Sequence, residues 1–240
     1  MAYPVFEEAS TVAYKSATDV DVSYPATVNA GDLLWCCVIC ASGTWSTPSG
    51  WTVLNGATTN RMVFWKEAAG TESGTLAVAK ASGSSQNYGL MYRWSGQKSG
   101  SDWLQGTVNE YLAISATVSI PNFTDDTTDD EILCASVCLV LDNNSANNNA
   151  SNYTERDDQL GTPGFFDSAF HLYTYQMASA GKPGTDSYTM TAADIYTVFS
   201  VGIAPASAAG YANDVNGVAA ATIAKINGVA TANIAKVSGV

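Results

Sequence analysis

The chain has 240 residues, a net charge of −12 and only 13% charged residues. Binding to nucleic acid or to an anionic membrane surface requires clustered lysine and arginine, and the 10 basic residues form no such cluster, so both partners are excluded. A chain with so few charges stays soluble through hydroxyl and amide groups or through burial in an assembly, and we favour the assembly.

The first residues, MAYPVFEE, lack the basic segment and long apolar run of a signal peptide. No stretch approaches the length needed to span a bilayer, so we expect no membrane insertion. We therefore expect synthesis in a cytoplasm without secretion.

Runs of β-branched and aromatic residues, cut by Gly, Pro, Ser and Asn clusters, predict strands up to Gly210. No segment of this part has apolar residues at helical spacing. In chain order, the predicted strands are Leu33–Ala41, Arg61–Ala68, Gly74–Lys80, Tyr88–Ser95, Ala113–Ile120, Glu131–Leu141, Ala169–Met177, Ser187–Thr191 and Tyr196–Ile203. The pattern predicts an all-β fold, an antiparallel and jelly-roll-like β-sandwich.

Two of these strands, Leu33–Ala41 and Glu131–Leu141, are apolar on both faces. A strand of an ordinary sandwich alternates between core and water, so these strands need cover on both sides. Either a loop of the same chain or another subunit must supply that cover. The second possibility predicts a homo-oligomer.

All five cysteines lie in the same two strands, at Cys36, Cys37, Cys40, Cys134 and Cys138. An odd count within apolar runs indicates buried, reduced thiols. A zinc site would need a knuckle turn, which a strand does not provide. We therefore expect no metal and no cofactor.

The order of strands in the first part of the chain recurs in the second. The corresponding segments are Gly31–Leu34 with Asp130–Leu133, Met62–Ala68 with Leu172–Ala178, and Gly74–Ala79 with Ser187–Ala192. This agreement predicts an internal duplication over residues 1–210, with halves at about 1–120 and 121–210 around one shared core. Two tandem small sandwiches are the alternative.

Residues 211–240 form a repetitive tail in which a four-residue motif begins at positions 215, 226 and 237, eleven residues apart. Its recurring members are Val215, Gly217, Ile226, Gly228, Val237 and Gly239. Each unit, such as residues 229–236, is predicted to form a short helix with a glycine cap. Since so short a helix is unstable alone, we expect the tail to serve docking or oligomerisation; a disordered tail is the alternative.

These motifs resemble a loose group of β-sandwich proteins of tailed bacteriophages. The resemblance is carried by residues 30–34 (AGDLL), 48–52 (PSGWT), 66–68 (KEA) and 94–96 (WSG), and by the tail repeat INGVATANIAK at 226–236. Members of such groups are fibre-like, tail-associated or head-decorating components of the virion. The resemblance implies a structural role on the particle surface, with other virion proteins as partners, and it carries over no catalytic or ligand-binding residue.

The sequence offers little catalytic chemistry. The only histidine, His171, lies in a predicted strand, and there is no Gly-x-Ser-x-Gly elbow and no phosphate-binding loop. Glycosidases use paired carboxylates, but nothing in the sequence pairs Glu67, Glu72, Glu110, Glu131 and Glu155. The chain is therefore predicted not to be an enzyme.

Two polar segments and three tryptophans are the candidate binding elements. The acidic run 125–131 is either a calcium loop or a solvated turn, and the loop 142–149 either carries recognition or is a tolerated insertion. Trp45, Trp51 and Trp103 lie in or beside turns, where indole rings stack on sugars or contact a partner; alternatively they fill the ends of the sandwich. The expected function is a virion structural protein that contacts the host surface, with a carbohydrate-binding module as the alternative.

Overall fold

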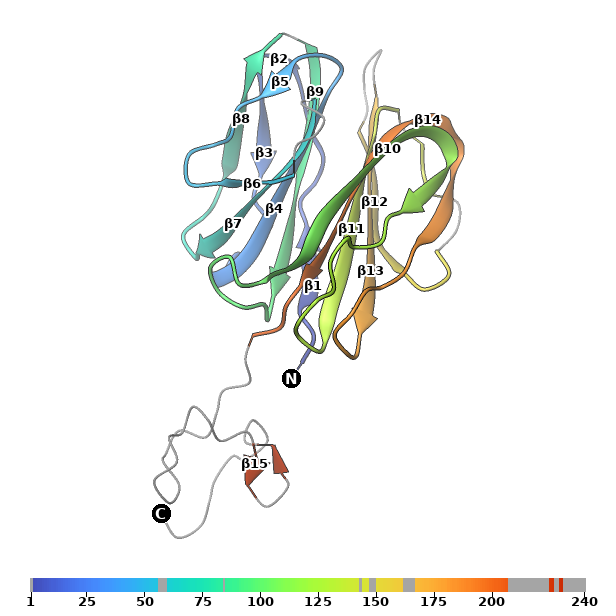
Figure 1. Cartoon of the computed structure of the whole chain (residues 1–240). Coiled ribbons are helices and arrows are strands. Elements are labelled where there is room, and N and C mark those ends of the chain that lie inside the picture. Colours follow the sequence, from blue (N-terminus) through green and yellow to red (C-terminus); the bar gives the residue numbers. More distant parts are fainter. Residues whose placement is uncertain are drawn as a thin grey trace.

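A computed structural model describes residues 2–55, 60–83, 85–142, 144–146, 150–161, 167–206, 225–226 and 229–230. The described residues contain strands and turns but no helix, and every strand pair is antiparallel. Two main sheets face each other (Figure 1). The predicted all-β antiparallel sandwich is confirmed.

The first sheet is built from the N-terminal part of the chain. Its order is β1-β9-β4-β7-β6, with β2 also paired to β9. The strands are β1 (Val5–Ala9), β2 (Ala13–Ala17), β4 (Ala30–Cys40), β6 (Thr52–Asn55), β7 (Arg61–Ala69) and β9 (Ser85–Ser95). A small second layer, called the small sheet, has the order β3-β8-β5, from β3 (Asp19–Ser23), β8 (Thr75–Ser82) and β5 (Thr44–Trp45).

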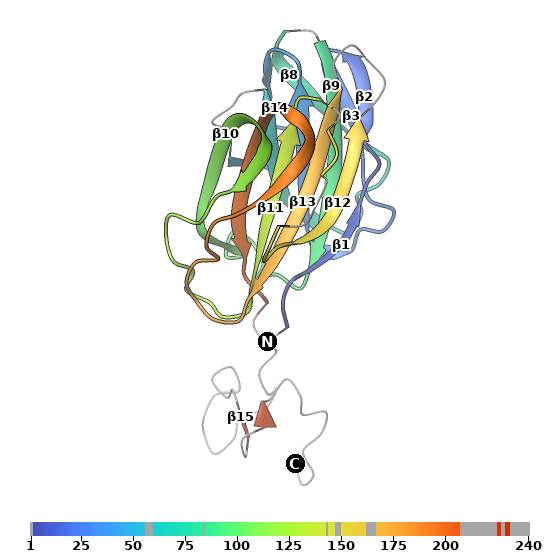
Figure 2. The same cartoon turned by 90° about the vertical axis from the view of Figure 1, so that its right-hand side faces the viewer.

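The second sheet is built from the following part of the chain and has the order β10-β14-β11-β13-β12 (Figure 2). Its strands are β10 (Leu104–Ile120), β11 (Ile132–Val140), β12 (Thr154–Gly161), β13 (Ser168–Met177) and β14 (Asp186–Ile203). The longest pair, β10 and β14, is called the β10–β14 ribbon. Each main sheet thus comes from one contiguous stretch of chain, and strands of the two sheets do not interleave along the sequence.

The two main sheets have the same topology. The central strands β4 and β11 correspond, and so do the hairpin partners β7 and β13, the edges β6 and β12, and the returning strands β9 and β14. Cys36 lies between Phe64 and Met91, as Ser136 lies between Tyr173 and Ser200. Leu33 and Leu133 both face the core between the main sheets, whereas Ile132 lies in the cluster on the outer face, so Leu33 corresponds to Leu133 and not to Ile132 as the sequence suggests.

The boundary between the halves differs from the prediction. Residues 104–120 were expected in the first half, but β10 pairs with β14 along most of its length. The chain therefore crosses between the main sheets in residues 96–103, not near residue 120. The sequence did not reveal this because an edge strand looks the same whichever sheet it joins.

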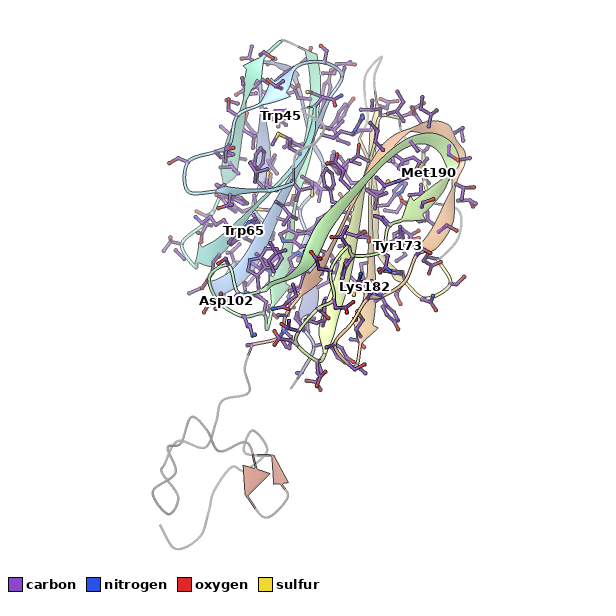
Figure 3. All side chains as sticks on the ribbon, viewed as in Figure 1. Trp45, Trp65, Asp102, Tyr173, Lys182 and Met190 are labelled. Carbon is purple, nitrogen blue, oxygen red and sulfur yellow. The ribbon has the colours of Figure 1, made fainter. Side chains whose placement is uncertain are left out.

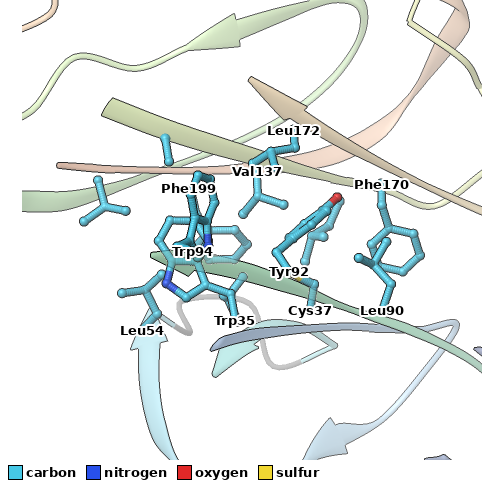
Figure 4. Packing of buried hydrophobic residues seen from close by; sticks show 14 of the residues in the cluster. Trp35, Cys37, Leu54, Leu90, Tyr92, Trp94, Val137, Phe170, Leu172 and Phe199 are labelled. Atoms are coloured by element: carbon cyan, nitrogen blue, oxygen red, sulfur yellow. The ribbon is translucent and has the colours of Figure 1, made fainter. Parts of the chain in front are cut away.

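One apolar core lies between the two main sheets and belongs to both halves (Figure 4). This shared core contains Leu33, Trp35, Cys37 and Ile39 of β4, Leu90, Tyr92 and Trp94 of β9, Leu133, Ala135, Val137 and Leu139 of β11, and Phe199 and Val201 of β14. The burial of so many large side chains from both sheets provides the main hydrophobic stabilisation. The core between the main sheets is thus one cluster to which both halves contribute.

The outer faces of β4 and β11 are covered by the chain itself. The small sheet places Val20, Val22 and Val78 over Leu34, Cys36 and Val38. Gly89 permits this close approach, because a Cβ there would meet Val22 Cγ2 at 2.6 Å. The cover of β4 therefore comes from this chain, and no second subunit is needed to supply it.

The second half covers its outer face differently. The β10–β14 ribbon bends so that one end lies over the sheet that contains the other end, as the curl in Figure 2 shows. Tyr188 and Met190 then pack with Ile132, Cys134 and Cys138. Met190 and Tyr173 are labelled beneath this curl in Figure 3. Again a segment of the same chain, not a partner, buries the second apolar face.

Most of the repetitive tail lies outside the described residues, including Val215, Gly217, Gly228, Val237 and Gly239. Two short strands are described there, β15 (Lys225–Ile226) and β16 (Val229–Ala230), which pair antiparallel. The helix predicted over 229–236 is therefore wrong for its first two residues. In a sequence, Asn-Gly is a common signal of a hairpin, and the helical prediction did not take it into account.

Candidate functional site

The three tryptophans proposed as contact residues are buried. Trp45 on β5 and Trp51 lie in the apolar cluster beneath the small sheet, where the Trp45 indole N–H donates to the Asn60 carbonyl at 3.3 Å (Figure 3). Trp103 packs in the shared core, with its ring centre 5.2 Å from that of Trp65 and 6.0 Å from that of Trp35. A stacking platform needs an exposed ring, so these residues do not form one; their burial matches the alternative in which they fill the sandwich.

His171 is fully buried in a polar network. Its Nε2 donates to the Asn144 carbonyl at 2.8 Å, so its Nδ1 accepts from the Tyr188 hydroxyl at 2.9 Å. Burial lowers the pKa of His171 to about 4, which keeps the ring neutral near pH 7. The network ties the loop after β11 to β13 and β14, and it gives His171 a structural role.

Asp157 and Asp158 of the edge strand β12 point to opposite faces of the second sheet. Asp157 pairs across the ladder with Leu172 and Asp158 with His171, so one carboxylate faces the shared core and the other faces the histidine network. Burial raises the pKa of each to about 6. Asp157 and Asp158 therefore do not face each other. Glu155 lies on the same face as Asp158, because it pairs with Tyr173, and it accepts the Tyr173 hydroxyl at 3.0 Å.

The acidic run at residues 125–131 is engaged in structural contacts. Lys98 Nζ lies 2.6 Å from Asp129 Oδ2, and Asp130 accepts the Ala180 N–H at 3.0 Å. Within the described ranges, no group of three or more His, Cys, Asp or Glu side chains is arranged to hold a metal ion. These contacts match the solvated turn better than a calcium loop.

The five cysteines are free and buried, as the sequence predicts. Burial raises the pKa of Cys138 to about 12 and raises those of Cys36 and Cys134 further. Since the thiolate is the reactive form, these residues serve packing.

A hollow on the outer side of the second sheet is an open concave feature of the described surface. This Tyr111 groove lies where β10 ends and β14 begins, has a volume of about 800 Å³, and is lined by Tyr111, Ser119, Ile120, Pro121, Asn122, Phe123, Thr185, Asp186 and Ser187. Phe123 is seated against two glycines, because a Cβ on Gly106 or Gly202 would meet its ring at 2.8 or 3.4 Å. The floor of the groove is thus fixed by close packing.

Tyr111 is an exposed aromatic residue on the wall of this groove, with 42% of its surface accessible. Its ring lies 6.2 Å from that of Tyr196, at an angle of 41°. The Tyr196 hydroxyl accepts the Ser119 N–H at 3.2 Å and donates to the Thr117 carbonyl at 3.1 Å. Tyr196 therefore holds the bend of β10 and supports Tyr111 from one side.

The rim of the groove is polar and held by backbone contacts. Asp186 accepts N–H groups from Ser151 at 3.2 Å and from Asn152 at 2.7 Å. Asn122 Oδ1 accepts the Gly184 N–H at 3.1 Å. These bonds hold Asp186 and Asn122, two residues that line the groove, in place.

A second surface feature lies on the opposite face of the same strand. Leu112 pairs with Thr197 and Ile114 with Ile195, so both lie on the side of the second sheet that faces the first. They are 51% and 72% exposed, because β10 is an edge strand and the neighbouring edge β6 is short. Leu112 and Ile114 together form an exposed apolar edge on β10.

Comparison with protein-family models, with curated proteins and with solved structures finds no match for this chain. Among the described residues, no helix is long and apolar enough to span a membrane. The described residues thus form a β-sandwich of two main sheets, with the Tyr111 groove on its outer side and an exposed apolar edge on β10.

Proposed function

We propose that this chain is a non-catalytic β-sandwich of the surface of a tailed-phage particle, and that it assembles with a second copy of itself through strand β10. The phage setting rests on the sequence motifs quoted above. The observation that carries the assembly is the exposed apolar edge of β10. The buried, neutral histidine supports a role in contact rather than catalysis.

Between its two ladder irregularities, the edge of β10 has little of the usual protection against pairing. Natural edge strands are short, charged or interrupted, because an open edge recruits other strands. β10 runs for 17 residues, and Glu110 is its only charged residue. The opposite edge, β12, is protected by Glu155, Arg156, Asp157 and Asp158 in succession.

A second copy of the chain fits this edge. Each copy carries a net charge of −12, so two copies meet most easily where few charges are present. A two-fold axis at Ala113 would set Leu112 opposite Ile114 of the second copy and Glu110 opposite Ala116, with no like charges facing. The ladder irregularity between Ser115 and Thr117 limits the pairing to a short segment, so we expect weak association that many copies on one particle reinforce.

Sedimentation over a concentration series tests the assembly. The wild-type mass should rise from 25.1 kDa towards twice that value at concentrations on the order of 100 μM. Ile114→Lys should remain monomeric, because a charge at the centre of the pairing is desolvated and faces apolar residues. The matched control is Leu160→Lys, at a 41% exposed leucine of β12, which should leave the association unchanged. A wild-type chain that stays monomeric throughout would refute the pairing.

The location on a particle needs a separate measurement. Mass spectrometry of purified phage particles should detect the chain in multiple copies per particle. Its absence from the particles, with the chain present in the lysate, would refute the virion assignment whatever the sedimentation shows.

A further inference from the structure

The Tyr111 groove combines one exposed aromatic ring with hydroxyl, amide and carboxylate groups. Ser119, Thr185 and Ser187 supply hydroxyls, Asn122 an amide and Asp186 a carboxylate. A pocket for a small apolar ligand would enclose most of the ligand surface in apolar walls. This groove is open, and most of the side chains along it are polar, so it fits a ligand that is itself covered with hydroxyls.

Tyr111 determines the type of contact. Its ring is supported by Tyr196 on one side and is 42% exposed. A pyranose ring has an apolar C–H face that packs on an aromatic ring, while its hydroxyls bond to surrounding polar groups. A peptide would need apolar pockets for its side chains, and the buried Ile120 and Phe123 form only a closed floor.

The charge of the site restricts the ligand further. The groove contains Asp186 and no basic residue, and the whole chain carries a net charge of −12. An anionic sugar would be repelled by this field. A neutral hexose unit, at the end of or within an oligosaccharide, meets no such barrier.

We propose that the Tyr111 groove is a binding site for neutral hexopyranose units of an oligosaccharide, with Tyr111 as the stacking platform and the polar rim as hydrogen-bonding partners. This site does not depend on pairing through β10. It lies on the outer face of the second sheet, whereas Leu112 and Ile114 lie on the face towards the first sheet.

Titration of the full-length chain with neutral gluco-, galacto- and manno-oligosaccharides, followed by NMR chemical shifts, tests the proposal. At least one neutral oligosaccharide should shift the resonances of Tyr111, Ser119 and Ser187. Tyr111→Ala should weaken that binding by about tenfold, and Tyr111→Phe should retain most of it. Sialylated oligosaccharides should bind more weakly than their neutral counterparts.

The matched control is Tyr14→Ala, since Tyr14 on β2 is a 37% exposed tyrosine that also lies beside another tyrosine, Tyr88. This variant should bind like the wild type. Ile114→Lys should also bind normally, which separates this proposal from assembly through β10. No shift with any neutral oligosaccharide at millimolar concentration, an unchanged affinity of Tyr111→Ala, or binding of unrelated peptides at the same resonances would overturn the proposal.

Discussion

The two halves share one topology but build the strand beside β9 or β14 in different ways. In the first half β1 and β2 pair with β9 and β3 pairs with β8, so both the edge strand and the returning strand are divided into shorter strands. In the second half β10 and β14 run through without a break in the chain. The first half therefore has an interrupted edge and a separate covering sheet, whereas the second half has a continuous ribbon that covers its own face.

This difference between the halves coincides with the two contact surfaces proposed above. Interruptions protect an edge from pairing with other chains, so the first half keeps a closed edge. The continuous β10 leaves an open edge on one face and the Tyr111 groove on the other. Both proposed contact surfaces thus occur where the second half departs from the first.

Truncation in the shared core should have the largest effect and should test whether the halves are one unit. Trp35→Ala should lower the free energy of unfolding by about 3–5 kcal/mol, because Trp35 is fully buried between the sheets. Urea unfolding followed by tryptophan fluorescence and by far-ultraviolet circular dichroism should still give one coincident transition. Two separate transitions would show that the halves unfold independently and would break the comparison.

Truncating a side chain in the small sheet or in the bent end of the β10–β14 ribbon should lower the free energy of unfolding by smaller and unequal amounts. Met190→Ala should lower global stability by about 2–5 kcal/mol, because β14 continues from the cover into the second sheet. Val22→Ala should cost less and act locally, because β3 belongs to the separate small sheet. Hydrogen exchange should then rise in β3, β5 and β8 while β4 keeps its protection. Equal loss of protection in β4 would contradict a separable cover.

The smallest expected effect is a pH-dependent contribution of β12 to the free energy of unfolding. The other edge strand, β6, has no ionisable side chain and should make no such contribution. Burial raises the pKa of Asp157 to about 6, so the folded state holds a proton that the unfolded chain releases near pH 4. Stability from this group is therefore present at low pH and lost as the pH rises from about 4 to 6. Asp157→Asn should remove this loss, by less than about 1 kcal/mol after solvent screening.

The pH experiment needs a comparison with the wild type because other groups titrate nearby. Asp158 shifts in the same direction, and His171, whose pKa is lowered to about 4, acts in the opposite sense between pH 4 and 6.5. Urea titrations of Asp157→Asn and of the wild type at pH 4, 5, 6 and 7 isolate the one group. Parallel profiles for the two proteins would contradict the burial of Asp157.

The sequence predicted the central strands well and the edges poorly. Strands such as β4, β11 and β13 have long apolar runs whose burial dictates their structure. β3 and β12 were not predicted, because aspartates alternate or cluster in them and short polar strands are held by their neighbours. The sequence correctly predicted that both faces of β4 and β11 are covered, but the pattern of apolar residues in these strands does not say which segment covers them.

The candidate site was not predictable for a related reason. Tyr111 stands two residues before the predicted strand Ala113–Ile120, whereas β10 begins at Leu104. Whether an aromatic residue beside a turn is buried depends on contacts far away in the sequence. Trp103 is covered by Trp35 and Trp65, and Tyr111 remains exposed because it lies on an edge strand with no further neighbour on that side among the described strands.

The segment that crosses between the halves is joined to the end of β14, and this contact has a practical consequence. Gln97 bridges Pro205, and the Ala206 N–H bonds to the Gly96 carbonyl at 2.7 Å, so β14 leaves the sandwich at the pole where β1 enters (Figure 1). In a protein tethered through residue 206, the turns at Ser42 and Asp142 would lie at the other end of the sandwich, because they follow the ends of β4 and β11 that are remote from Trp94 and Ile203. Foreign peptides inserted at those distal turns would be displayed outward, and fusions to the N-terminal side would lie beside the tether.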